Sequence, residues 1–324
     1  MTTAGPPVTA AKPSAITFRH TTETDLPAAF AVFHAAQDEL HKRRGAPWKV
    51  STFDPAGPWA TLQRHLLAHD SAHAFVAEDD GRIVGFTAAL VRGDFWYLSA
   101  LFVDPACQGK GVGARLFELA WDASCRRYAT VTEAIQPVSN GLYARRGVLP
   151  VTPMLVFSGR PRVDSRIDSR ADSRVDSRVD ARVDARAGGL QAVAPTREAL
   201  AAIDLAAYGF DRGADHALWA RMSQGTTLWQ RDGTPCAYSY RDTIPGLIGP
   251  VAGRDAETAA LALRAELART PENGSVRLSI PGTATALVRV ALDAGLRFDD
   301  PGLLLLSPGN ALPSSWIPHS FWLL

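Results

Sequence analysis

The sequence predicts an α/β fold, a mixed sheet with helices on both faces, in two tandem domains joined by a flexible linker. Its 324 residues, of which 46% are apolar and 21% are charged, suffice for two domains with buried cores. Helical periodicity alternates with short strand-like runs in each half of the chain. Between the halves, over 162–185, runs a four-residue repeat of Arg, an apolar residue, Asp and Ser or Ala.

The first half predicts alternating strands and helices. Branched and aromatic runs indicate the strands, and apolar residues three and four positions apart indicate the helices. The expected strands are 16–19, 74–78, 82–91, 95–103, 130–134 and 151–157, and the expected helices are 22–42, 59–68, 112–126 and 139–145. Asp80 and Gly81 are typical of a hairpin turn between the second and third strands.

The repeat predicts a linker over 161–189. Residues 162–186 hold seven Arg and six Asp. A helix would stack like charges four residues apart, and a strand would have one face too thin for a core. A flexible, charge-balanced linker fits best, and a frayed helix is the alternative. An arm that binds nucleic acid is disfavoured because the aspartates would repel phosphate.

The overall composition excludes several classes of protein. The 34 basic residues nearly cancel the 33 acidic ones, so no net field favours nucleic acid or an anionic membrane. Residues 1–14 have no apolar core and are expected to be a disordered tail, neither signal peptide nor anchor. Cys107, Cys125 and Cys236 lack Cys-x-x-Cys spacing. We therefore expect a cytoplasmic protein without a metal site or a membrane contact.

A glycine-rich loop lies between an expected strand and an expected helix. It reads Gln108-Gly-Lys-Gly-Val-Gly113. Glycines in such a turn let backbone N–H groups converge on an anion, and the helix N-terminus adds its positive dipole end. Gly109, Gly111 and Ala114 also satisfy the dinucleotide pattern G-x-G-x-x-G/A. That pattern should follow the first strand of a parallel unit, whereas here a long segment with a hairpin comes first.

Two motifs occur in the order and spacing of a known family. A strand ending L-x-V-x-P leads into Q-x-x-G-x-G, and N-x-x-Y follows later, before a glycine that opens the last strand. The residues that carry the match are Leu101, Phe102, Val103, Pro105, Gln108, Gly111, Gly113, Asn140, Tyr143 and Gly147. Through them, residues 15–160 resemble a domain of the GCN5-related N-acetyltransferase (GNAT) family, which uses acetyl-coenzyme A (acetyl-CoA).

The resemblance implies a role for each matching position. The strand backbone would pair with the pantetheine arm, and the glycine loop would hold the pyrophosphate. The implied cofactor-binding residues are Leu101, Phe102, Val103, Gln108, Gly109, Lys110, Gly111, Val112, Gly113, Ala114 and Asn140. Tyr143 stands where relatives have a general acid. Its alternative role is that of a packed phenol on the last helix.

The general base is less defined by the sequence. Many relatives carry a Glu two residues before the L-x-V triplet, but this chain has Ser99 there. Glu133, on the neighbouring strand, is the preferred candidate base. Asp94, Glu39 and His34 are alternatives, and an amine that arrives neutral needs no base. Aromatic candidates for the acceptor wall are Trp48, Trp59, Phe95, Trp96 and Tyr97.

Residues 190–310 repeat the order of elements and predict a degenerate GNAT-like copy, followed by a tail over 311–324. The alignment puts the strand Leu247-Ile-Gly249 on Leu101-Phe-Val103 and puts Arg254 on Gln108. The loop that follows has no glycine, and Asp255 and Glu257 would oppose a phosphate. Ala291 falls at the position of Tyr143. We therefore expect no cofactor site in this copy.

The leading functional hypothesis is a cytoplasmic N-acetyltransferase that moves an acetyl group from acetyl-CoA to a primary amine by direct attack in a ternary complex. The acceptor is a small molecule or a peptide, and the protein is a monomer or a homodimer. A non-catalytic CoA-binding or regulatory module is the alternative, because Ser99 replaces the expected base. An NAD-binding oxidoreductase is a distant third.

Overall fold

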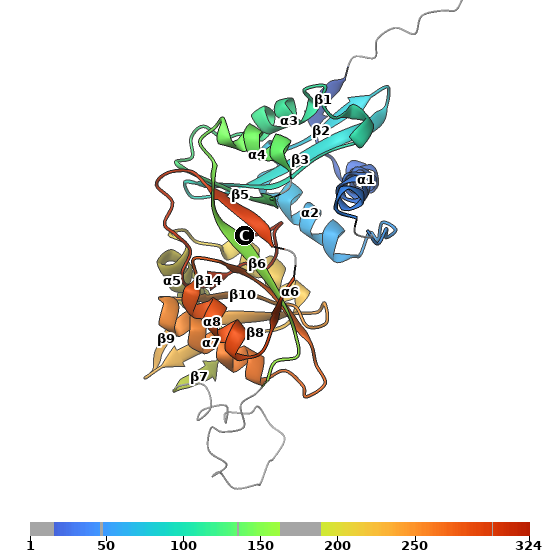
Figure 1. Cartoon of the computed structure of the whole chain (residues 1–324). Coiled ribbons are helices and arrows are strands. Elements are labelled where there is room, and N and C mark those ends of the chain that lie inside the picture. The colour runs from blue at the N-terminus through green and yellow to red at the C-terminus, as the bar shows by residue number, and fades with distance from the viewer. Residues whose placement is uncertain (1–15, 46–47, 135, 163–188, 300) are drawn as a thin grey trace, which may run out of the picture. The chain divides into compact units, whose positions relative to one another are not determined.

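A computed structural model describes residues 16–45, 48–134, 136–162, 189–299 and 301–324 (Figure 1). The expected tail at 1–14 and nearly all of the repeat lie outside these residues. The described chain forms two compact units. Unit 1 is Met1–Leu67, Ser71–Ala88 and Leu101–Trp121, and unit 2 is Ala68–Asp70, Ala89–Ala100 and Asp122–Leu324. The ranges 15–160 and 190–310 come from the repeated order of elements in the sequence. The two compact units have different bounds from these ranges.

Unit 1 contains a small antiparallel sheet with helices. In it β1 pairs with β2, and β2 pairs with β3, all antiparallel. The elements that lie wholly or partly in this unit are β1 (Thr17–His20), η1 (Glu23–Asp25), α1 (Leu26–Arg44), α2 (Pro58–Asp70), η2 (Ser71–His73), β2 (Ala74–Asp79), β3 (Arg82–Arg92), β4 (Phe95–Val103), η3 (Pro105–Cys107) and α3 (Val112–Ala120).

Local chemistry explains where these elements begin and end. Asp80 and Gly81 both have positive φ, as the predicted turn between β2 and β3 requires. Gly45, at φ 66°, ends α1 in the left-handed conformation. Helix α3 ends at Ala120, earlier than the expected 126, because Trp121 has an extended backbone. Its buried face, with Val112 and Leu116, packs on Val84 and Val103 of the sheet.

Unit 2 contains the remaining strands and helices. After the ends of β3 and β4, its elements are β5 (Arg127–Glu133), α4 (Pro137–Ala144), β6 (Leu149–Gly159), β7 (Leu190–Val193), α5 (Arg197–Ala207), α6 (Gly213–Met222), β8 (Ser223–Arg231), β9 (Thr234–Asp242), β10 (Ile248–Gly253), α7 (Ala256–Ala268), β11 (Val276–Pro281), α8 (Thr285–Asp293), β12 (Arg297–Phe298), β13 (Gly302–Leu306) and β14 (Trp316–Ile317). None of the helices in the described part of the chain has the length and hydropathy for a membrane span.

Within unit 2 the two sequence repeats exchange their last strands. Strand β4 is parallel to β5 over Phe95 to Leu98. Strand β13, from the second repeat, is antiparallel to both β5 and β6, which belong to the first. Strand β6 in turn is antiparallel to β11 of the second repeat. Figure 1 shows the green strand β6 beside the red strand β13. Each repeat thus needs a strand of the other to complete its sheet.

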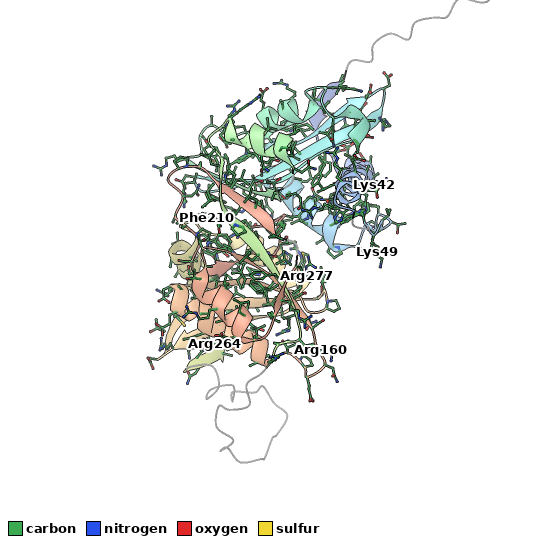
Figure 2. The ribbon with its side chains drawn as sticks, viewed as in Figure 1. Lys42, Lys49, Arg160, Phe210, Arg264 and Arg277 are labelled. Carbon is green, nitrogen blue, oxygen red and sulfur yellow. The ribbon has the colours of Figure 1, made fainter. Side chains whose placement is uncertain are left out.

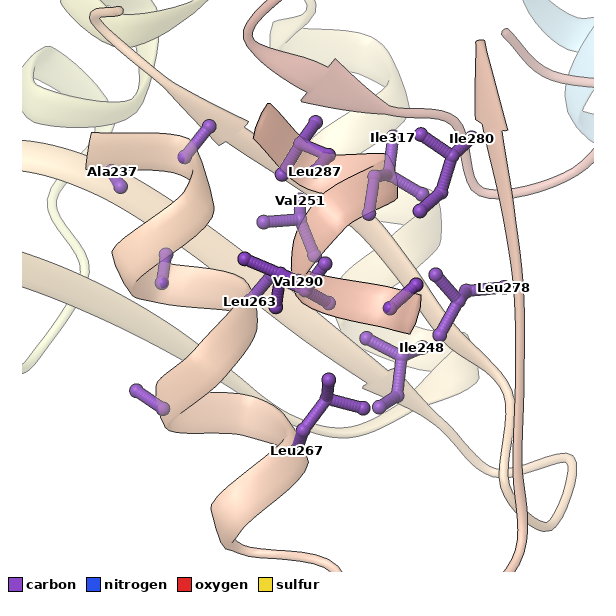
Figure 3. Close-up of a cluster of buried hydrophobic side chains, with 14 of the residues drawn as sticks. Ala237, Ile248, Val251, Leu263, Leu267, Leu278, Ile280, Leu287, Val290 and Ile317 are labelled. Carbon is purple, nitrogen blue, oxygen red and sulfur yellow. The ribbon is translucent and has the colours of Figure 1, made fainter. Parts of the chain in front are cut away.

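A second sheet in unit 2 has the order β14-β10-β9-β8-β7. Helices α7 and α8 supply apolar side chains to its core (Figure 3). Leu263 of α7 and Val290 of α8 lie near Val251 of β10, and Ile317 of β14 belongs to the same cluster. Phe210, labelled in Figure 2, stacks on Phe95 with ring centroids 4.7 Å apart.

Buried ion pairs hold the start of α6 in unit 2. Arg92 Nη2 lies 2.6 Å from Asp215 Oδ1, and Arg92 Nη1 lies 3.0 Å from Asp70 Oδ1. Arg212 Nε lies 2.9 Å from the other oxygen of Asp215. Asp215 is completely buried and serves two guanidinium groups. Removing its charge would leave the buried Arg212 guanidinium without its paired carboxylate and Arg92 with Asp70 alone, which is more costly than replacing the whole cluster with apolar groups.

We expect Asp215→Asn to lower the free energy of unfolding by about 3–5 kcal/mol, because Arg92 and Arg212 keep their buried charges. Denaturant unfolding followed by circular dichroism measures it. The control is Glu257→Gln, which removes an exposed carboxylate paired with Arg231 and should leave the unfolding midpoint unchanged. Equal midpoints for the two variants would contradict the role assigned to Asp215.

Candidate functional site

The glycine loop of unit 1 is anchored by Asp104, directly after β4. One carboxylate oxygen of Asp104 accepts a hydrogen bond from the Ala106 amide at 2.9 Å and caps η3. The other accepts from Arg82 Nη1 at 2.8 Å. The Asp104 amide donates to the Val84 carbonyl at 2.8 Å. The start of the loop is therefore fixed to β3 by both side chain and backbone.

Residues 108–111 turn the chain into α3. The side-chain amide of Gln108 donates to the Val103 carbonyl at 3.0 Å, which ties the loop back to the strand. Gly109 and Gly111 have φ values of 76° and 83°. An L-residue is strained in this left-handed region, whereas glycine is not. The two glycines are therefore required by the backbone, and a Cβ at either position would meet no atom within 4 Å.

The amides of this loop are available for a ligand. The first hydrogen bond of α3 runs from the Arg115 amide to the Gly111 carbonyl at 3.0 Å. Within the described chain, the amides of residues 109–114 donate to no protein acceptor. Lys110 is exposed in the same loop. Unpaired amides at a helix N-terminus with a nearby ammonium group suit a diphosphate. These residues therefore fit the group expected from the sequence.

The corresponding loop of the second repeat satisfies its own amides. Strand β10 ends at Gly253, and only two residues separate it from α7. Asp255 caps α7 by accepting a hydrogen bond from the Thr258 amide at 2.8 Å. A Cβ at Gly253 would lie 2.4 Å from the Ala259 amide nitrogen, so α7 packs against β10 too closely for a side chain at this position. The protein's own carboxylate occupies the position of an anion.

The gap between β10 and β11 is also filled. These strands meet only at a parallel bridge between Leu247 and Arg277. Beyond it, β14 pairs with β10 at Val251 and Ala252 and also contacts β11. This is the edge of β10 that a pantetheine arm would need. The structure thus supplies a physical reason for the expectation that this copy has no cofactor site.

The expected catalytic residues lie in unit 2. Tyr143 is on α4, with 4% of its surface exposed, and burial raises the pKa of its phenol well above the usual value, although a hydrogen bond with Ser139 opposes this. Asn140 Nδ2 donates to the Ala134 carbonyl at 3.4 Å, and its buried Oδ1 has no hydrogen-bond partner within the described chain. Glu133 is half-buried at the end of β5. A phenol with a raised pKa stays protonated at neutral pH and can act as an acid.

The three alternative bases have identifiable partners. Asp94 pairs with Arg127 and Arg126, and these partners lower the pKa of its carboxyl. Glu39 pairs with Arg43 one helical turn away, at 3.1 Å. His34 Nδ1 accepts from Trp48 Nε1 at 3.1 Å. Burial lowers the pKa of this imidazole.

The expected aromatic wall is divided between the two units. In unit 1, Trp48 and Trp59 join a ring cluster, and Phe102 of β4 packs 5.0 Å from Phe33, measured between ring centroids. In unit 2, Phe95, Trp96 and Tyr97 are buried. Leu101, Phe102, Val103 and the loop belong to unit 1, whereas Glu133, Asn140 and Tyr143 belong to unit 2. Sequence reasoning missed one contact: Ser99 Oγ donates to the Trp322 carbonyl at 2.6 Å.

An α/β fold with a glycine loop between strand and helix, whose amides have no acceptor within the described chain, is typical of proteins that bind a phosphate-containing group. Residues 33–148 match the model of the Acetyltransferase (GNAT) family. No curated protein matches the sequence significantly.

Several solved structures share the fold. A protein from Pyrococcus horikoshii classed as an acetyltransferase has a TM-score of 0.67 at 13% identity, over 99% of this chain and 100% of that one. A GCN5-related N-acetyltransferase from Sphaerobacter thermophilus has a TM-score of 0.56 at 17% identity, over 93% and 98%. A tandem GNAT protein from the clavulanic acid pathway has a TM-score of 0.50 at 16% identity, over 90% and 98%. The expected tandem GNAT fold is confirmed.

We expect Gly109→Ala to weaken acetyl-CoA binding about tenfold. The free loop can relax away from the left-handed conformation, so binding has to restore it at a cost of about 1–2 kcal/mol. Isothermal titration calorimetry measures the dissociation constant. Gly225→Ala is the control, because Gly225 lies on β8 with no positive φ and no atom within 4 Å of a Cβ. Unchanged affinity in Gly109→Ala would contradict the role of the loop.

The same titration should give one acetyl-CoA per chain. Asp255 and β14 block the site of the second repeat, as described above. A stoichiometry of two would show that this copy binds the cofactor despite both obstacles.

Proposed function

We propose that the protein is an acetyl-CoA-dependent N-acetyltransferase that acts on a primary amine, of a small molecule or a peptide, in the cytoplasm. The observation that carries the proposal is the loop of unit 1, in which the amides of residues 109–114 have no acceptor within the described chain. The family match at 33–148 includes this loop. It also removes the support for a nicotinamide cofactor, since the G-x-G-x-x-A pattern falls inside the acetyltransferase motif.

Acetyl-CoA supplies a thioester whose carbonyl carbon forms a bond to the amine nitrogen while the bond from carbon to sulfur breaks. In our proposal the loop amides and Lys110 hold the pyrophosphate, and the backbone of Leu101, Phe102 and Val103 binds the pantetheine arm. Asn140 supports the cofactor from α4. The loop amides and Asn140 Oδ1 have no hydrogen-bond partner within the described chain.

Two proton movements have to be served. The attacking nitrogen loses a proton, and the departing thiolate gains one. We propose Tyr143 as the acid, because its position matches that of the general acid in the family, and a tyrosine phenol carries its proton at neutral pH. Glu133, half-buried at the end of β5, is the proposed base. The Ser99 hydroxyl donates a hydrogen bond to the Trp322 carbonyl, so we do not propose Ser99 as the base.

A non-catalytic CoA-binding module is the second candidate. The observation in its favour is that Ser99, at the position of the usual base, is hydrogen-bonded to Trp322. Such a module would bind acetyl-CoA without releasing its thiol in the presence of any amine. Detection of free thiol across a panel of amines therefore separates the two candidates.

We expect Tyr143→Phe to lower kcat about 100-fold or more while the dissociation constant of acetyl-CoA stays unchanged, because the variant removes only the proton donor. Thiol release under saturating acetyl-CoA measures kcat. Tyr128→Phe is the control, since that hydroxyl donates to the Asp122 and Cys125 carbonyls of a surface turn. Equal kcat values for Tyr143→Phe and wild type would remove Tyr143 from the mechanism.

A further inference from the structure

The last five residues of the chain, 320–324, form a segment with a defined position in unit 2. Leu323 and Leu324 are buried, with 0% and 4% of their surfaces exposed, and they anchor the segment. Phe321 and Trp322 are only half-buried. None of the five side chains is charged, and the preceding His319 is engaged by Asp242 at 2.7 Å. The segment therefore presents aromatic groups without charge.

Two side chains of β4 hold this segment. The Tyr97 hydroxyl donates to the Phe321 carbonyl, and Ser99 Oγ donates to the Trp322 carbonyl at 2.6 Å. Tyr97 and Ser99 are two residues apart, so they share one face of the strand. The carbonyls of Phe321 and Trp322 thus accept hydrogen bonds from two side chains on the same face of β4. This register fixes the segment along β4.

The segment lies where β4 and β5 separate. Their parallel pairing ends at Leu98 and Thr130, immediately before Ser99 and Val131. A Cβ at Gly302 of β13 would lie 2.8 Å from Phe321 Cε2 and 3.1 Å from Val131 Cγ1. The Phe321 ring therefore covers Gly302, next to β5. It borders the opening between the two strands.

This opening is also near the proposed acid. Tyr97 lies in unit 2, and burial raises the pKa of its phenol. The nearby Tyr143 phenol contributes in the same direction, because a charge on one ring disfavours a charge on the other. The Tyr97 hydroxyl is thus linked both to the Phe321 carbonyl and to the surroundings of Tyr143.

We propose that Phe321 is a specificity-determining residue that forms a wall of the acceptor site, and that the acceptor is a primary amine with an aromatic or apolar body. The inference rests on the proposed acetyl transfer. A half-exposed phenyl ring gains free energy by covering apolar substrate surface. A polyamine, with several ammonium groups, would instead need several carboxylates, and no side chain of the segment carries one.

The test compares phenethylamine with putrescine in wild type, Phe321→Ala and Phe321→Leu. Leu keeps most of the apolar volume if Ala proves unstable. We expect the wild type to prefer phenethylamine. In Phe321→Ala the KM of phenethylamine should rise about tenfold, and the KM of acetyl-CoA should stay unchanged. Calorimetric binding of phenethylamine to the complex with coenzyme A gives a readout that does not depend on turnover. The control is Leu312→Ala, an exposed apolar side chain of the same stretch.

The outcomes separate the two proposals. Wild-type protein that does not bind acetyl-CoA overturns the proposed function, and this inference with it. If acetyl-CoA binds, but phenethylamine binds Phe321→Ala and Phe321→Leu as it binds wild type, the wall is overturned and the proposed function stands. A wild-type preference for putrescine overturns the assigned acceptor class. Weaker phenethylamine binding in Phe321→Ala, with Leu312→Ala unchanged, supports the inference.

Discussion

The insertion of β13 between β5 and β6 is the constraint on which unit 2 depends. Leu304 and Leu305 of β13 are completely buried, and their strand bonds to both neighbours. Strand β5 therefore has no partner on that side until a segment some 170 residues later in sequence has folded. Such long-range pairing is slow to form, because the entropy of closing the loop is lost before the contacts are gained. The two repeats consequently form one cooperative structure within this unit.

Local signals in the sequence predict local structure. They do not predict the exchange of strands between the two repeats. Asp80 and Gly81 fix the β2–β3 hairpin because the turn itself demands positive φ. The apolar run at 303–306 indicates a buried strand equally well. It carries no information on which strands lie beside it, since any apolar partner of matching length would cover it. The partner is decided by tertiary packing, and so is the placement of the final residues, expected only as a tail.

The candidate site divides in the same way. The glycine loop is predictable because Gly109 and Gly111 are required by their own backbone conformation. A general base is not predictable from residue type, because its availability depends on what lies beside it. Asp94, for example, is paired with Arg127, a neighbour that its own residue type does not reveal. Ser99 is likewise explained only by Trp322, more than 200 residues later.

The two repeats differ in what the amides at a helix N-terminus bond to. Those at the start of α3 have no acceptor within the described chain, whereas Asp255 accepts a hydrogen bond from an amide at the start of α7. An N-cap such as Asp255 contributes about 0.5–2 kcal/mol by satisfying an amide that would otherwise be left for a ligand. In the second repeat Asp255 uses that amide, and β14 pairs with the edge of β10. The chain then continues from β14 to β4, where Phe321 meets the opening beside β5. The strand that covers the edge of β10 is therefore closely followed in the chain by the segment whose Phe321 we propose as a wall of the acceptor site.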